Sequence, residues 1–78
     1  MADQTERQTA IGQRLMALRT ARGWSRETLG RKSETAPLTI LRAELHGTDP
    51  AISTLTRWAE ALDVTVAELI EDDGPAAA

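Results

Sequence analysis

The sequence contains no cysteine, phenylalanine or tyrosine, and His46 is its single histidine. Without cysteine there is no disulfide, no thiolate metal site and no thiol nucleophile. One imidazole cannot build a zinc site by itself, and no Gly-rich phosphate loop or Ser–His–Asp set with a plausible base is present. A chain of 78 residues also has little volume for a substrate pocket of the usual ~300 Å³. We therefore expect no metal, no cofactor, no small-molecule substrate and no enzymatic activity.

Aromatic residues are scarce, since Trp24 and Trp58 are the only two. This argues against the aromatic stacking platforms of proteins that bind RNA or single-stranded nucleic acid. No apolar run approaches the ~18–20 residues of a membrane span, and no signal-peptide pattern opens the sequence. We expect one small soluble domain, located in the cytoplasm and not associated with a membrane.

The charged residues are unevenly distributed along the chain, whose net charge is −3. Residues 1–47 carry eight Arg or Lys residues and five acidic residues, a net charge of +3. Residues 48–78 carry Arg57 and seven acidic residues, a net charge of −6. The first part of the chain could therefore present a basic face to a polyanion such as DNA, whatever the overall sign of the charge.

Hydrophobic spacing predicts short helices throughout and no strand. Apolar residues three or four apart indicate helices near residues 9–21 and 52–62. Ser25 is a suitable N-cap for a helix that runs to about Ser33, and Pro37 fits the first turn of a helix that ends at residue 45 or 46.

The last helix has a clear local start signal, because Thr65 and Glu68 form a capping box. We therefore predict a compact all-α domain of five helices over residues 9–71. It would lie between a flexible N-terminal arm (residues 1–8) and a disordered acidic and alanine-rich tail (residues 72–78).

Residues 24–45, WSRETLGRKSETAPLTILRAEL, combine a capped helix, a three-residue break and a second short helix. A helix-turn-helix places its second helix in the DNA major groove by this arrangement. Further ordered matches in the chain are Ile11-Gly12, Arg14-Leu15, Leu18-Arg19, Arg22-Gly23-Trp24-Ser25, Glu27, Leu29, Ile40, Arg42, Glu44, Pro50, Leu55, Ala59-Glu60-Ala61-Leu62 and Val64. With them, residues 11–70 resemble the Cro-like or phage-repressor-like (xenobiotic-response-element type) helix-turn-helix family.

The resemblance implies a five-helix repressor-like fold with its helix-turn-helix at about residues 26–45. It also implies a homodimeric transcriptional repressor or activator that binds a palindromic site in double-stranded DNA, with the helix at about 37–45 in the major groove. The implied DNA-binding residues are Arg26, Pro37, Leu38, Thr39, Leu41, Arg42 and Leu45, with Arg26 on a phosphate. Further candidate phosphate contacts are Arg14, Arg22 and Arg31, which together with Arg19 otherwise form a solvated face. The inward positions of the recognition helix would be Thr35, Ile40 and Ala43.

Two positions near the turn depart from the family pattern. Glu34 stands where glycine is usual, and a glutamate at positive φ costs ~1 kcal/mol or more. Ala36 stands where a serine-type N-cap is typical, which leaves a helix N-terminus without a side-chain acceptor, a loss of ~1 kcal/mol.

The leucines of the expected reading face, Leu38, Leu41 and Leu45, admit three interpretations. Leu38 and Leu41 could contact thymine methyl groups while Arg42, Thr39 and Arg26 supply polar and phosphate contacts. Alternatively, the three leucines form an apolar surface for a protein partner, on a natural or an engineered repressor scaffold. In the third interpretation the helix is rotated and some of the leucines are buried in the core.

Several other residues carry simpler expectations. Trp24 and Trp58 should pack in the core, and His46 should be a surface cation at a helix end. Arg42 could instead form a structural ion pair with Asp49 or Glu44. Leu69 and Ile70 are candidate dimer contacts by resemblance, and a core role is equally open for both.

Overall fold

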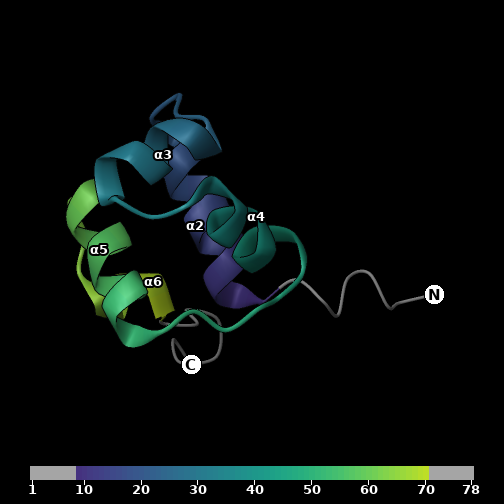
Figure 1. Ribbon diagram of the computed structural model, residues 1–78. Coiled ribbons are helices and arrows are strands. Elements are labelled where there is room, and N and C mark those ends of the chain that lie inside the picture. The colour runs from purple at the N-terminus through teal and green to yellow at the C-terminus, as the bar shows by residue number, and fades with distance from the viewer. Residues whose placement is uncertain (1–8, 71–78) are drawn as a thin grey trace.

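The structure, a computed structural model, describes residues 9–70, which form five helices and no strand (Figure 1). The helices are α2 (Ala10–Ala21), α3 (Arg26–Ser33), α4 (Pro37–Leu45), α5 (Ile52–Leu62) and α6 (Val66–Ile70). The predicted all-α class is confirmed, and the helix ends fall within a residue or two of those expected. The predicted arm (1–8) and tail (72–78) lie outside the described residues.

Side-chain caps account for the starts of three of these helices, by Thr9 for α2, Ser25 for α3 and Thr65 for α6. The Ser25 hydroxyl accepts a hydrogen bond from the backbone N–H of Thr28 at 3.0 Å, as the N-cap prediction requires. The backbone N–H of Glu68 donates to the Thr65 hydroxyl at 3.0 Å, and the Thr65 N–H donates to the Glu68 carboxylate at 3.4 Å. The predicted capping box is therefore confirmed.

The turn between α3 and α4 keeps the geometry that usually requires glycine. Glu34 lies in the left-handed region, with φ 59° and ψ 41°, as the residue that ends α3. Ala36 precedes α4 as its N-cap without a side-chain hydrogen bond, and Pro37 follows at the start of the helix. Both departures from the family pattern are therefore real, and the chain tolerates the strain at Glu34 and the missing cap at Ala36.

The core lies where the five helices meet. Its fully or nearly fully buried apolar residues are Leu15, Leu29, Ile40, Ala43, Leu55, Trp58, Ala59, Leu62 and Leu69. Trp24 is half-buried and packs against this cluster, so the core prediction is confirmed for both tryptophans. Leu69 is a core residue, whereas Ile70 next to it is exposed.

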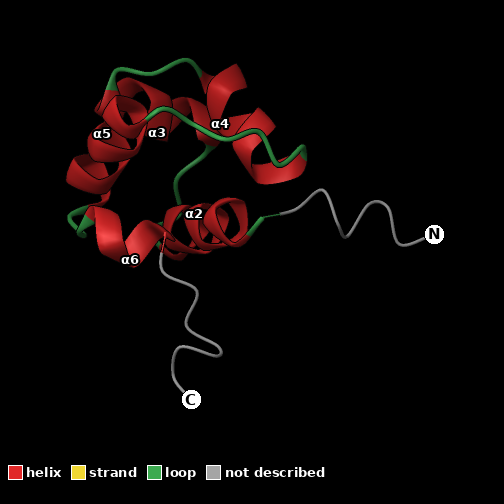
Figure 2. Ribbon diagram, turned by 90° about the horizontal axis from the view of Figure 1, so that it is seen from below, coloured by secondary structure: helices red, strands yellow, loops and turns green. Residues whose placement is uncertain are grey.

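The helices pack so that α4 contacts both α2 and α3 (Figure 1). Figure 2 shows α2 and α6 on one side of the molecule and α3, α4 and α5 on the other. Gly12 permits the contact between α2 and α4, because a Cβ at this position would collide with the backbone carbonyl of Ala43. A larger residue at this position would therefore push α4 away from α2.

We predict that Glu34→Gly raises the free energy of unfolding by about 1 kcal/mol, because glycine adopts the left-handed conformation without a Cβ clash. Urea denaturation followed by circular dichroism measures the change. Glu34→Ala is the control, since it keeps the backbone strain and removes only the exposed contact with Arg57 at 3.3 Å. Equal stability of Glu34→Gly and Glu34→Ala would show that the backbone strain contributes nothing.

Candidate nucleic-acid interface

The helix α4 has one buried side and one exposed side. Ile40 is 0% exposed and Ala43 is 2% exposed, as expected for inward positions. We define the outer face of α4 as Pro37, Leu38, Thr39, Leu41, Arg42 and Leu45. All of these are exposed except Leu41, which is half-buried. The expected orientation is confirmed, and the interpretation that Leu38 and Leu45 belong to the core is wrong.

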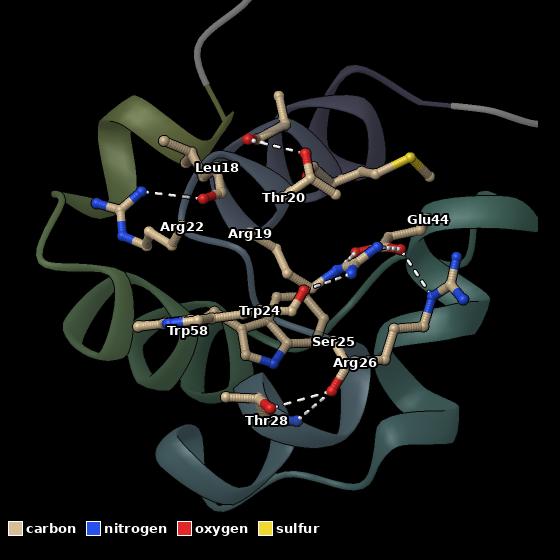
Figure 3. Close-up of polar contacts among 12 residues, drawn as sticks. Leu18, Arg19, Thr20, Arg22, Trp24, Ser25, Arg26, Thr28, Glu44 and Trp58 are labelled. Carbon is tan, nitrogen blue, oxygen red and sulfur yellow. Dashed lines mark hydrogen bonds and ion pairs between the residues drawn. The ribbon is translucent and has the colours of Figure 1, made fainter.

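A buried carboxylate holds α4 in this orientation (Figure 3). Glu44 is fully buried and accepts two hydrogen bonds from Arg19, from Nε to Oε2 at 2.8 Å and from Nη2 to Oε1 at 2.9 Å. Arg26 donates its Nε to Oε1 of the same carboxylate at 2.8 Å. Two arginines thus compensate one buried negative charge, and no buried side-chain nitrogen or oxygen among the described residues lacks a hydrogen-bond partner.

Arg19 was expected on a solvated face, and that expectation is wrong. The residue is 7% exposed, and its Nη1 also donates to the backbone carbonyl of Trp24 at 2.8 Å. It therefore connects α2, the α2–α3 loop and α4. A signal for this was present in the sequence, because Arg19 lies four residues after Leu15 and so on the apolar side of α2.

Arg26 begins α3 and lies beside α4. Its side chain is 31% exposed, and Nε is the only nitrogen of the guanidinium with a hydrogen-bond partner among the described residues. Glu44 therefore orients this guanidinium while Nη1 and Nη2 remain available. Arginine binds phosphate oxygens through such paired N–H groups.

Arg42 projects from the outer face of α4. Two ion pairs were considered for it, with Asp49 and with Glu44. Arg42 is exposed and makes no ion pair within residues 9–70, while the Glu44 carboxylate is occupied by the two other arginines. Its guanidinium is thus available at the surface.

Of the three other candidate phosphate contacts, Arg14 lies on α2, Arg22 at the end of α2 and Arg31 on α3. Arg22 donates to the Leu62 carbonyl at 2.6 Å and to the Leu18 carbonyl at 3.0 Å, so it joins the ends of α2 and α5. Figure 3 shows Arg22 and Arg26 on opposite sides of Arg19. Arg31 is exposed near the end of α3, and Arg14 is half-buried on α2.

A chain of hydrogen bonds fixes the turn before α4. The indole of Trp58 donates to the Thr35 hydroxyl at 3.0 Å, and Thr35 and Ser33 share a hydrogen bond at 2.8 Å. Ser33 in turn donates to the Leu29 carbonyl at 2.7 Å. Sequence reasoning placed Thr35 on the inward side, and the link to α5 through Trp58 becomes visible only in three dimensions.

One hollow in the described part of the chain was considered as a site for small-molecule chemistry and does not suit it. An open hollow of about 410 Å³ is lined by Lys32, Ser33, Glu34, Arg57 and Glu60. Within it, Arg57 already pairs with Glu34 and Ser33 is satisfied by backbone carbonyls. Residues 9–70 contain no group of three or more potential metal ligands, and none of their helices has the length and hydropathy of a membrane span.

We predict that Glu44→Gln lowers the free energy of unfolding by about 3 kcal/mol or more, because it leaves two arginines around a neutral buried amide. Arg42→Ala, which removes an exposed and unpaired side chain, should change it by less than about 0.5 kcal/mol. Urea titration of both variants measures the difference. A Glu44→Gln protein as stable as Arg42→Ala would contradict the structural role assigned to the buried carboxylate.

Comparison with known proteins places this arrangement in a family. Residues 15–69 match the family model described as Helix-turn-helix, HTH_3. No match was found among curated proteins. Among solved structures, the chain is similar to the restriction-modification controller protein C.AhdI from Aeromonas hydrophila, with 34% identity and a TM-score of 0.75 over 80% of this chain and 94% of that one.

A second similar structure is a complex of the SinR and SinI proteins. The identity is 31% and the TM-score 0.75, over 85% of this chain but only 65% of that one. The family match covers more than half of the chain, and both structural matches agree with it in fold. The chain therefore belongs to the HTH_3 helix-turn-helix family of DNA-binding domains.

Proposed function

We propose that this protein is a homodimeric transcriptional regulator that inserts α4 into the major groove of duplex DNA. The observation that carries the proposal is the exposed outer face of α4, held outward by the buried Glu44 carboxylate. In a helix-turn-helix, the second helix of the motif lies in the major groove and its N-terminal residues reach the base edges. The positions expected from this geometry are Pro37, Leu38, Thr39, Leu41, Arg42 and Leu45.

Arg26 would supply the principal phosphate contact. It stands at the first position of α3, where the helix dipole also favours an anion. Its Nε is oriented by Glu44 and its remaining N–H groups have no partner in the described part of the chain. A phosphate oxygen placed against them would receive charge-assisted hydrogen bonds without a new ordering cost for the side chain. Arg14 and Arg31 are secondary candidates for phosphate contacts.

A dimer would place two copies of α4 in successive major grooves, about 34 Å apart on one side of the duplex. Regulation would then be steric, because the bound dimer blocks or recruits polymerase. C.AhdI, which this chain matches over almost its whole length, is by its description a controller protein. A protein that binds DNA must be in the same compartment as the DNA. We propose that this compartment is the cytoplasm.

A second candidate function is a protein-interaction module that uses Leu38, Leu41 and Leu45. Two of these leucines are large apolar residues exposed at the surface, 53% for Leu38 and 37% for Leu45. The similar SinR structure was solved as a complex with another protein, SinI. Under this alternative, the unmodified protein would retain no duplex DNA, and Leu38→Asp would abolish its association with the protein partner.

We expect Arg26→Ala to weaken binding to duplex DNA. We also expect the slope of log K against log salt concentration to become less steep by about 0.9, which is the value for one lost phosphate contact. Fluorescence anisotropy at several salt concentrations measures both quantities. Arg57→Ala is the matched control, because Arg57 pairs with Glu34 on the α3–α5 side and should leave the slope unchanged.

Absence of any salt-sensitive binding of the unmodified protein to mixed duplex DNA at ~50–100 mM salt would overturn the proposed function. A slope that is unchanged in Arg26→Ala but reduced in Arg57→Ala would move the phosphate-binding surface to the other side of the molecule.

The proposed dimer can be tested separately at Ile70, which is 45% exposed at the end of α6. If α6 lies in the interface, Ile70→Asp should convert a two-chain species to a single chain in sedimentation equilibrium, because it would bury an unpaired carboxylate. Ile52→Asp on α5 is the control, since Ile52 is even more exposed, at 70%. Loss of the dimer in Ile52→Asp alone would place the interface at α5.

A further inference from the structure

We propose that the outer face of α4 recognises thymine by its 5-methyl group, through Leu38 and Leu41. This inference rests on the proposed function and deepens it, because it names the chemical group by which the DNA site is read. Leu38 is 53% exposed and Leu41 is half-buried beside it. Residues three apart on a helix lie on the same side, so both side chains face one surface.

The positions of Leu38 and Leu41 along α4 allow the two side chains to contact neighbouring base pairs. Leu38 is the second residue of α4, in the helical turn that reaches base edges in this class of motif. Leu41 follows about 4.5 Å further along the helix axis, given a rise of about 1.5 Å per residue. Base pairs succeed one another about every 3.4 Å along the duplex, so the two side chains can meet consecutive or nearly consecutive bases.

The chemistry of leucine selects thymine among the four bases. The major-groove edge of thymine carries a methyl group beside its O4 acceptor, whereas guanine, cytosine and adenine present hydrogen-bond donors and acceptors without a methyl group. A leucine against those polar groups would remove their water without replacing the hydrogen bonds, which is unfavourable. The same side chain therefore favours thymine and disfavours the other bases.

The packing of α4 prevents a rotation that would bury Leu38 and Leu41 in the core. Ile40 and Ala43 fill the inward positions, and Glu44 is bound by two arginines on the same side of the helix. A rotation of α4 that buried Leu38 would bring this carboxylate out of its ion pairs. The apolar surface is therefore a fixed feature of the folded chain.

Arg42 adds a polar contact to this surface. It is exposed on the same helix and free of ion pairs within the described residues. Arginine pairs in a bidentate manner with guanine O6 and N7, so the expected half-site combines thymines with one guanine.

The test begins with selection of a preferred duplex from a random-sequence pool by the whole 78-residue chain. Each thymine of the selected half-sites is then replaced by deoxyuridine, which lacks only the methyl group. We expect affinity to fall about fourfold for each methyl group that Leu38 or Leu41 contacts, the value for one buried apolar carbon. Deoxyuridine outside the half-sites is the control and should have no effect.

Leu38→Ala provides the matched protein variant, because Leu38 is exposed and its truncation leaves the core intact. This variant should bind the thymine duplex more weakly than the unmodified protein does. It should also lose its sensitivity to deoxyuridine at one position of each half-site. Circular dichroism verifies that the variant is folded.

The outcomes separate the two proposals. If DNA binding is salt-sensitive but unaffected by deoxyuridine, or if the selected half-sites contain no thymine, the thymine inference is overturned and the proposed function stands. If Leu38→Ala still loses the full affinity at every position where deoxyuridine replaces thymine, Leu38 does not contact a thymine methyl group. If no duplex is retained at all and Leu38→Asp abolishes association with a protein, the leucines serve the protein-interaction alternative.

Discussion

The structure depends on one buried negative charge. Glu44 is fully buried, and a carboxylate in that position is tolerated only because Arg19 and Arg26 both donate hydrogen bonds to it. These three residues come from α4, α2 and α3, so a single interaction determines how three helices pack. The Glu44 carboxylate therefore lies where α2, α3 and α4 meet, and apolar side chains of these helices pack around it.

This constraint also determines which side of α4 meets the solvent. With Ile40, Ala43 and Glu44 directed inward, helical geometry places Leu38 and Arg42 on the opposite side. The turn before the helix is secured from α5 by the hydrogen bond between Trp58 and Thr35. The proposed recognition of DNA by α4 and the stability of the fold therefore share the same interactions, and the exposed leucines are a consequence of the packing.

Much of the fold could be predicted from the sequence, because its signals are local. The N-cap is indicated by Ser25 with Glu27 in the first turn, the capping box by Thr65 and Glu68 three residues apart, and Pro37 marks the start of α4. The inward side of α4 followed from the spacing of its apolar residues and from the resemblance to the family. The strained Glu34 was recognisable because a single position departs from the usual glycine.

The site was less predictable because its key contacts join distant residues. Arg19 and Glu44 are 25 residues apart, and Arg26 and Glu44 are 18 apart, so no local pattern pairs them. The chemistry of arginine favours a solvated position, although Arg19 lies on the apolar side of α2. The choice between core and surface for Leu69 and Ile70 was equally open, because α6 has only five residues and little periodicity.

If the buried Glu44 carboxylate orients the outer face of α4 toward DNA, NMR spectroscopy can locate the contact surface directly. Isotopically labelled protein is titrated with duplex DNA, and the chemical-shift changes of the backbone amides and of the arginine side-chain N–H groups are recorded. We expect the largest changes along α4 and at the first turn of α3, including the side-chain N–H of Arg26. Changes concentrated on α5 and α6, with α4 unaffected, would show that another surface binds the duplex.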